Sequence, residues 1–116
     1  SKSLKGLINK FDAKIMDSFL MTTKIKNTFG YSGNGDFIKN KKNQIERFDN
    51  NKAKIPLVYC GVQIVKRNQF DNYDSNVFST NKIWDNNIKH KKLYTFMTNK
   101  KFNHVGTIES VIGLNK

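Results

Sequence analysis

The sequence predicts one small domain of the mixed α/β or α+β class, and three observations support this. Its 116 residues are enough for a single domain with a modest core. A hydrophobic fraction of 37% with nine Phe, four Tyr and one Trp is typical of a folded protein. Strand-like and helix-like segments alternate along the chain, which shows no internal repeat and no low-complexity linker.

The first half of the chain predicts one short helix followed by strands. The helix is indicated by apolar residues spaced along a single face, namely Leu4, Leu7, Ile8 and Phe11. The stretch "SFLMTTKI" predicts a buried strand, and "FGYSGNGDF" predicts a glycine-rich loop. A β-hairpin with a polar turn at residues 40–43 is expected in "DFIKNKKNQIERF". The strongest strand is "IPLVYCGVQIV", where Gly61 in the middle indicates close approach of a ligand or of another backbone.

The second half predicts two helices and two short strands. Ser79, Thr80 or Asn81 can cap a helix whose inner face carries Ile83, Trp84, Asn87 and Ile88. Two short strands are expected in "KLYTFMT" and "FNHV". Thr107 can then cap a final helix that has Glu109 in its first turn. The long strand at residues 55–65 has too few partners to close a sheet, which indicates a fragment or a partner.

The net charge of +12 raises the possibility of a nucleic-acid-binding domain. Nineteen of the 21 basic residues are lysine, however, and they are scattered, whereas base and phosphate recognition favours arginine. Lys, Asn and Ile together make up 46 residues, a compositional bias that explains the charge. We therefore expect solvated surface lysines, and a basic nucleic-acid-binding domain remains an alternative.

The same composition indicates a cytoplasmic protein. Cys60 is the only cysteine, which excludes an internal disulfide framework and fits a reducing compartment. No stretch approaches the roughly 18 to 20 apolar residues that a bilayer-spanning helix needs. The N-terminal "SKSLKGLINKF" is too polar for a secretory signal.

No catalytic set emerges from the spacing of the residues. The two histidines and one cysteine give no zinc-binding pattern, and no P-loop, dinucleotide fingerprint or serine-hydrolase motif is present. Asp36 and Glu46 lie across the expected hairpin, so strand pairing could bring the two carboxylates together, although surface acids are the simpler interpretation. We expect no catalytic residue in this chain on its own.

Five blocks nevertheless follow one another in a recognisable order: "DAKIMDSFLM", "GYSGNGDF", "VYCGVQIV", "FSTNKIWDNNIKHKKLY" and "FNHVGTIESV". In this order they resemble the C-terminal half of bacterial sugar-1-phosphate nucleotidyltransferases. The branch concerned includes N-acetylmuramate-1-phosphate uridylyltransferase and mannose-1-phosphate guanylyltransferase-like proteins. The resemblance implies that residues 1–116 form the C-terminal part of a Rossmann-like α/β fold, with a mixed sheet and flanking helices. The N-terminal half, whose Gly-rich loop cradles the nucleotide, is not in this sequence.

The resemblance also implies substrate-binding residues on the sugar side of the site: Gly35, Asp36, Glu46, Gly61, Asn81, His104, Gly106 and Thr107. Gly35 matches a glycine whose backbone lies against the sugar, and Gly61 matches one beside the sugar ring. His104 stands where Asp is common, so its sugar contact would be of a different kind.

In the complete enzyme, a sugar 1-phosphate attacks the α-phosphorus of a nucleoside triphosphate, giving a nucleoside-diphosphate-sugar and pyrophosphate. Mg²⁺ is the expected cofactor of that enzyme, and many relatives hold it with an Asp near Asn81, where an amide is a weaker ligand. Without the phosphate-cradling loop the chain should not catalyse alone.

The expected partners are therefore a sugar 1-phosphate or nucleoside-diphosphate-sugar, and an N-terminal half that a separate polypeptide could supply. The alternative is a non-catalytic remnant or regulatory module that binds a sugar nucleotide or a protein. An unpaired sheet edge should also favour a homo-oligomer, which light scattering can check.

Overall fold

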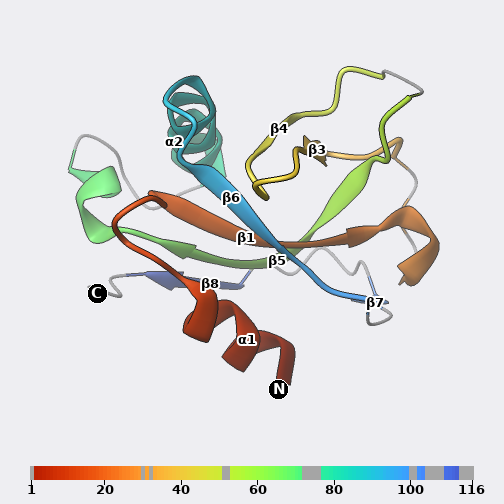
Figure 1. Ribbon diagram of the computed structural model, residues 1–116, viewed down its shortest axis with the longest axis horizontal. Helices are drawn as coiled ribbons and strands as arrows, with labels where there is room; N and C mark the ends of the chain where they lie inside the picture. The colour runs from red at the N-terminus through yellow and green to blue at the C-terminus, as the bar shows by residue number, and fades with distance from the viewer. Residues whose placement is uncertain are drawn as a thin grey trace.

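The computed structural model describes residues 2–29, 31, 33–50, 53–71, 77–99, 102–103 and 109–112. The described residues form two α-helices, α1 (Lys2–Lys10) and α2 (Val77–Lys89) (Figure 1). The strands are β1 (Ser18–Lys24), β2 (Thr28–Phe29), β3 (Phe37–Lys39), β4 (Ile45–Arg47), β5 (Leu57–Val65), β6 (Leu93–Met97), β7 (Phe102–Asn103) and β8 (Glu109–Ile112). Short 3-10 turns follow β1 at Ile25–Asn27 and β5 at Arg67–Phe70.

The main sheet is mixed, and β5 lies at its centre. Five strands follow the order β4-β3-β5-β1-β6, and β8 pairs with the second half of β5. β5 runs antiparallel to β1 and β3, whereas β6 runs parallel to β1 and β8 runs parallel to β5. β2 and β7 form a separate parallel pair. The expected α/β domain with a mixed sheet and flanking helices is confirmed at this level.

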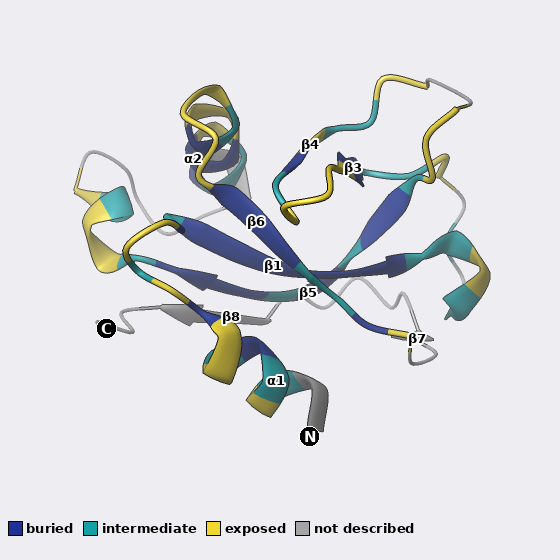
Figure 2. Cartoon of the chain, in the orientation of Figure 1, coloured by how far each residue is buried: buried dark blue, intermediate teal, exposed yellow. Residues whose placement is uncertain are grey.

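The two helices cover opposite faces of the sheet because side chains alternate along its strands (Figure 1). Phe19 and Met21 of β1 pack with Leu7 of α1 in one buried cluster. Leu20, which lies between them, packs with Trp84 of α2 in a second cluster. Figure 2 shows that the buried residues follow β1, the middle of the sheet and the inner sides of both helices.

Polar side chains fasten α2 to its face of the sheet. The Trp84 indole donates a hydrogen bond to the Gln63 side chain of β5 at 2.9 Å, and both residues are buried. Ser18 of β1 donates to the side chain of Asn87. Because buried polar groups are costly unless they are hydrogen-bonded, these contacts help to define how α2 lies on the sheet.

Gly61 marks a bulge in the central strand. The register changes from the pair Leu20↔Gln63 to the pair Thr22↔Tyr59, so three residues of β5 lie opposite Met21 alone. Gly61 has φ +81°, a conformation that favours glycine. Gly61 was expected to mark close approach of a ligand or of another backbone, and the structure gives it a different role, because the positive φ in the bulge favours glycine.

Two expected helix boundaries are wrong. α2 already begins at Val77, so Ser79, Thr80 and Asn81 lie within the helix and do not cap it. The final helix expected after Thr107 is instead β8, with Val111 opposite Ile64 of β5. A short run rich in β-branched residues has no periodicity that separates helix from strand, and the edge of β5 stabilises the extended form.

The β3–β4 hairpin is confirmed, and its tip lies against β6. Gln44 forms a backbone bridge with Tyr94, and the Thr95 N–H donates to the Asn43 carbonyl at 2.9 Å. The Gln44 side-chain amide also donates to the Lys91 carbonyl and to the Tyr94 hydroxyl. The first strand along the sheet, β4, thus contacts the last, β6.

Neither helix formed by the described residues has the length and apolar character that crossing a bilayer would require.

Candidate functional site

The first candidate site lies where β3 meets the start of β5. Gly35 precedes β3 with φ +118°, a conformation that side-chain-bearing residues rarely adopt. A Cβ atom at this position would collide with the Pro56 ring. The Gly35 N–H donates a hydrogen bond to the Tyr31 hydroxyl at 2.9 Å. The backbone at Gly35 therefore lies close to Pro56, with the Tyr31 hydroxyl as its hydrogen-bond partner.

Asp36 extends the hydrogen bonding between β3 and β5 beyond their single pair, Phe37↔Leu57. Its N–H donates to the Leu57 carbonyl at 2.8 Å, and its carbonyl accepts from the Phe48 N–H at 3.0 Å. The carboxylate then accepts the backbone N–H of Tyr59 at 2.9 Å. The Asp36 carboxylate thus provides the acceptor for the Tyr59 N–H, beyond the point where β3 pairs with β5.

The charge of Asp36 also reaches neighbouring titratable groups. Burial raises the pKa of the Tyr31 hydroxyl, the Gly35 N–H opposes this, and the Asp36 carboxylate raises it further. Burial, and secondly the charge of Asp36, raise the pKa of the Cys60 thiol to about 12. Cys60 directly follows Tyr59, whose N–H the Asp36 carboxylate accepts, and Gly61 is the next residue along β5.

The Cys60 thiol should make stability fall at high pH. Its pKa is raised in the folded protein above the ordinary value near 8.5, so its contribution is fully present below about pH 8.5 and is lost as the pH rises towards 12. We expect the difference in free energy of unfolding between the native chain and Cys60→Ala to shrink by about 1 kcal/mol per pH unit between about pH 9 and 11. Urea denaturation of both proteins measures this, and a pH-independent difference would contradict it.

Glu46 lies elsewhere on the hairpin. It is opposite Ile38 in the β3–β4 register, and its exposed side chain lines a pocket whose described lining includes neither Asp36 nor Tyr59. Asp36 directs its carboxylate towards Tyr59 instead. The two acids therefore do not form a carboxylate pair.

Asn81 is held by Arg47 of β4. The Arg47 guanidinium donates to the Asn81 side-chain oxygen at 2.9 Å and forms an ion pair with Asp85 at 3.0 Å. It also lies over the rings of Phe37 and Trp84, with its carbon 5.4 Å and 5.6 Å from the ring centroids. A position whose oxygen already accepts from a cation does not fit a Mg²⁺ ligand. No group of three or more His, Cys, Asp or Glu side chains in the described part of the chain could hold a metal ion.

His104, Gly106 and Thr107, the remaining expected substrate-binding residues, lie outside the described residues.

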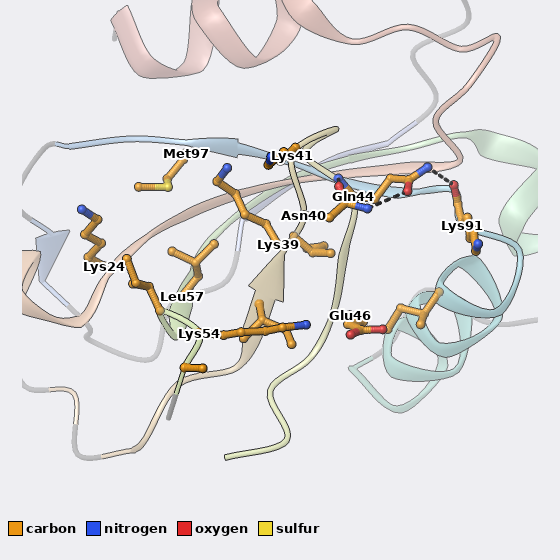
Figure 3. A pocket seen from close by; sticks show the side chains of 15 residues that line it. Lys24, Lys39, Asn40, Lys41, Gln44, Glu46, Lys54, Leu57, Lys91 and Met97 are labelled. Atoms are coloured by element: carbon orange, nitrogen blue, oxygen red, sulfur yellow. Dashed lines mark hydrogen bonds between the residues drawn. The ribbon is translucent and has the colours of Figure 1, made fainter. Parts of the chain in front are cut away.

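A pocket that the sequence did not predict lies between the hairpin, the end of α2 and the open ends of β1 and β6 (Figure 3). We call it the hairpin pocket. Its volume is about 790 Å³. In the described part of the chain, its charged lining is Glu46 and five lysines, Lys24, Lys39, Lys41, Lys54 and Lys91. The aliphatic lining includes Ile38, Ile45, Ile55, Leu57, Ile88 and Met97.

The hairpin pocket was missed because its lysines come from separate segments of the chain. Lys39 and Lys41 flank the start of the hairpin turn, and this is the only part of the set with a local signal. The others join them only through the sheet order and the docking of the hairpin tip on β6. A scattered distribution in sequence therefore does not mean a scattered distribution in space.

Comparison of this chain with protein families, with curated proteins and with solved structures finds no match.

Proposed function

We propose that this chain supplies the sugar-phosphate-binding part of a nucleotidyltransferase with a Rossmann-like fold. The complete enzyme would join a sugar 1-phosphate to a nucleoside triphosphate and release pyrophosphate. The supporting observation is that Gly35 and Asp36 lie against the start of β5, where Gly35 approaches Pro56 and the Asp36 carboxylate accepts the Tyr59 N–H, two residues before Gly61. Gly35, Asp36 and Gly61 are residues that the resemblance assigns to the sugar side.

The corner around Gly35 has the chemistry that a sugar hydroxyl needs. The Tyr31 hydroxyl accepts the Gly35 N–H and lies beside the Asp36 carboxylate. A sugar hydroxyl needs one hydrogen-bond donor and one acceptor. The Tyr31 hydroxyl has both, because the Gly35 N–H donates to it and the Asp36 carboxylate can accept from it. In this proposal a substrate hydroxyl replaces or extends the Tyr31 contact.

The nucleotide side is assigned to a complementary segment with a Gly-rich loop. Transfer at phosphorus depends on holding the reactants in line and neutralising the phosphate charge. The corner around Gly35 offers a glycine backbone, a hydroxyl and a carboxylate, which suit the hydroxyls of the sugar and supply no cation for a nucleotide triphosphate. The chain in this proposal binds and orients the sugar, and it does not catalyse on its own.

Amide chemical shifts of the isolated chain test the binding step. Addition of a panel of sugar 1-phosphates should shift the backbone amide signals of Gly35, Tyr59 and Gly61 for at least one sugar. Asp36→Asn should weaken that response at least tenfold, because it removes the charged acceptor, whereas Asp71→Asn at an exposed turn should leave it unchanged. If no common sugar 1-phosphate shifts these amides, the proposal fails.

A reconstitution assay tests the reaction. The chain is mixed with an N-terminal nucleotidyltransferase half that carries the Gly-rich loop, and pyrophosphate release is followed with each sugar 1-phosphate. Release that requires both polypeptides is the expected result. A stable complex without activity towards any of these sugars would count against the assignment.

A further inference from the structure

We propose that the hairpin pocket binds an amphiphilic anion, namely a ligand with a multiply charged phosphate head and an aliphatic body. The inference rests on the lining of the pocket alone, and it holds whether or not the chain is part of a nucleotidyltransferase. Two features of the lining carry it: the excess of lysine over acid, and the uniformly aliphatic character of its apolar part.

The charged lining calls for a ligand with more than one negative charge. Among the described residues, five lysines and one glutamate line the pocket, so these groups leave an excess of four positive charges. None of these lysines takes part in the ion pairs that the described residues form. Lysines that line one cavity give it a positive potential, which an anion lowers. A carboxylate supplies one charge, whereas a phosphate monoester carries about −1.5 to −2 and a diphosphate carries more.

The apolar lining selects an aliphatic body. Ile38, Ile45 and Leu57 are buried within the fold, while Ile88 and Met97 are half-buried. Of the described residues around the pocket, none is aromatic, although proteins commonly bind nucleobases by stacking them on aromatic rings. Branched aliphatic side chains instead suit a flexible hydrocarbon chain, for which each buried methylene improves the affinity about fourfold.

Ile55 extends this apolar surface to the outside. It lines the pocket and yet is 62% exposed, which makes it one of the few large hydrophobic side chains that the described structure leaves open to solvent. Lys54 precedes it and lies across the pocket (Figure 3). The pocket volume of about 790 Å³ lies within the roughly 300–1,000 Å³ that is usual for small-molecule sites.

Three probes of different chemistry test the proposal by calorimetric titration in the absence of divalent cations. Geranyl diphosphate combines both features, inorganic pyrophosphate has only the charged head, and uridine diphosphate replaces the hydrocarbon with a nucleoside. We expect saturable one-to-one binding of geranyl diphosphate that is at least tenfold tighter than binding of the other two and that weakens with added salt. Equal or tighter binding of pyrophosphate or uridine diphosphate overturns the proposal, and so does the absence of saturable binding.

Matched variants at exposed positions locate the site without threatening the fold. Lys54→Gln should weaken geranyl diphosphate and pyrophosphate alike by about fivefold, whereas Lys14→Gln, exposed outside the pocket, should change neither by more than about twofold. Ile55→Ser should weaken geranyl diphosphate about four- to tenfold and leave pyrophosphate unchanged. Its control is Ile15→Ser, an exposed isoleucine outside the pocket lining. Equal effects of a pocket variant and its control would mean that the probe binds the protein surface non-specifically, through charge or hydrophobicity. That result would contradict the proposal.

The outcome is separable from that of the sugar-phosphate experiments. Binding of geranyl diphosphate with no response of Gly35 or Gly61 to any sugar 1-phosphate supports the pocket and removes the nucleotidyltransferase function. The reverse result removes the pocket and leaves that function in place.

Discussion

Replacing Phe37 with alanine is expected to lower the free energy of unfolding by about 3–5 kcal/mol. The Phe37 side chain is fully buried where the hairpin, β5 and α2 meet. Its ring packs edge-on against Trp84, with centroids 5.6 Å apart, and the Arg47 guanidinium lies over it. Removal of the ring leaves a cavity beneath Arg47 and takes away contacts that three elements share. Since domains of this size are stable by only about 5–15 kcal/mol, this loss is a large fraction of the total stability.

The fluorescence of Trp84, the single tryptophan, reports this unfolding directly during a urea titration. Phe29→Ala is the matched control, because Phe29 is 55% exposed and its loss should cost less than about 1 kcal/mol. Equal losses at the two positions would mean that the hairpin is not packed against α2 as described.

The second large effect is expected for Gly35→Ala, which should cost about 2–4 kcal/mol. Two penalties add at this position. The φ of +118° costs a residue with a side chain about 1–3 kcal/mol, and the new methyl group would overlap the Pro56 ring, which is held at the entrance to β5. Thermal or urea denaturation measures the loss.

Gly6→Ala is the control for this substitution. A Cβ at Gly6 would come within 2.8 Å of the end of the Phe96 ring, a contact that a flexible side chain can relieve. Alanine also gains about 1 kcal/mol of helix propensity within α1, so the net change should be small. A loss at Gly35 no larger than that at Gly6 would show that the backbone at residue 35 tolerates a side chain.

The elements that could be predicted from sequence are those with a strong local pattern. β1 and β5 are rich in β-branched and aromatic residues, and the helical spacing in α1 is clear. The hairpin followed from its polar turn. The strand β8 was mistaken for a helix because its four residues have no distinguishing period, and pairing with β5 decides their conformation.

The candidate site could be predicted only where one residue carried a special backbone requirement. Gly61 was singled out by its place in a strand, and it proved to lie in a bulge. The hydrogen bond from Tyr59 to Asp36 depends on where β3 leaves β5, a register that no local pattern encodes. For the same reason the sequence could place Asp36 and Glu46 on one hairpin but could not show that Asp36 accepts the Tyr59 N–H while Glu46 lines a pocket.

The parallel pairing of β1 with β6 has a consequence for the order of folding. Ser18 lies beside Leu93 in the sheet, although the two residues are 75 positions apart along the chain. At a synthesis rate of about 5–20 residues per second, β1 leaves the ribosome roughly 4 to 15 seconds before its parallel neighbour exists. During that interval α1 can cover the face of β1 that carries Phe19 and Met21, and β5 can later pair with one edge of β1. Closure of β6 against β1 and the hairpin tip comes late, before β8 pairs with β5, and such distant pairing is characteristic of slow folding.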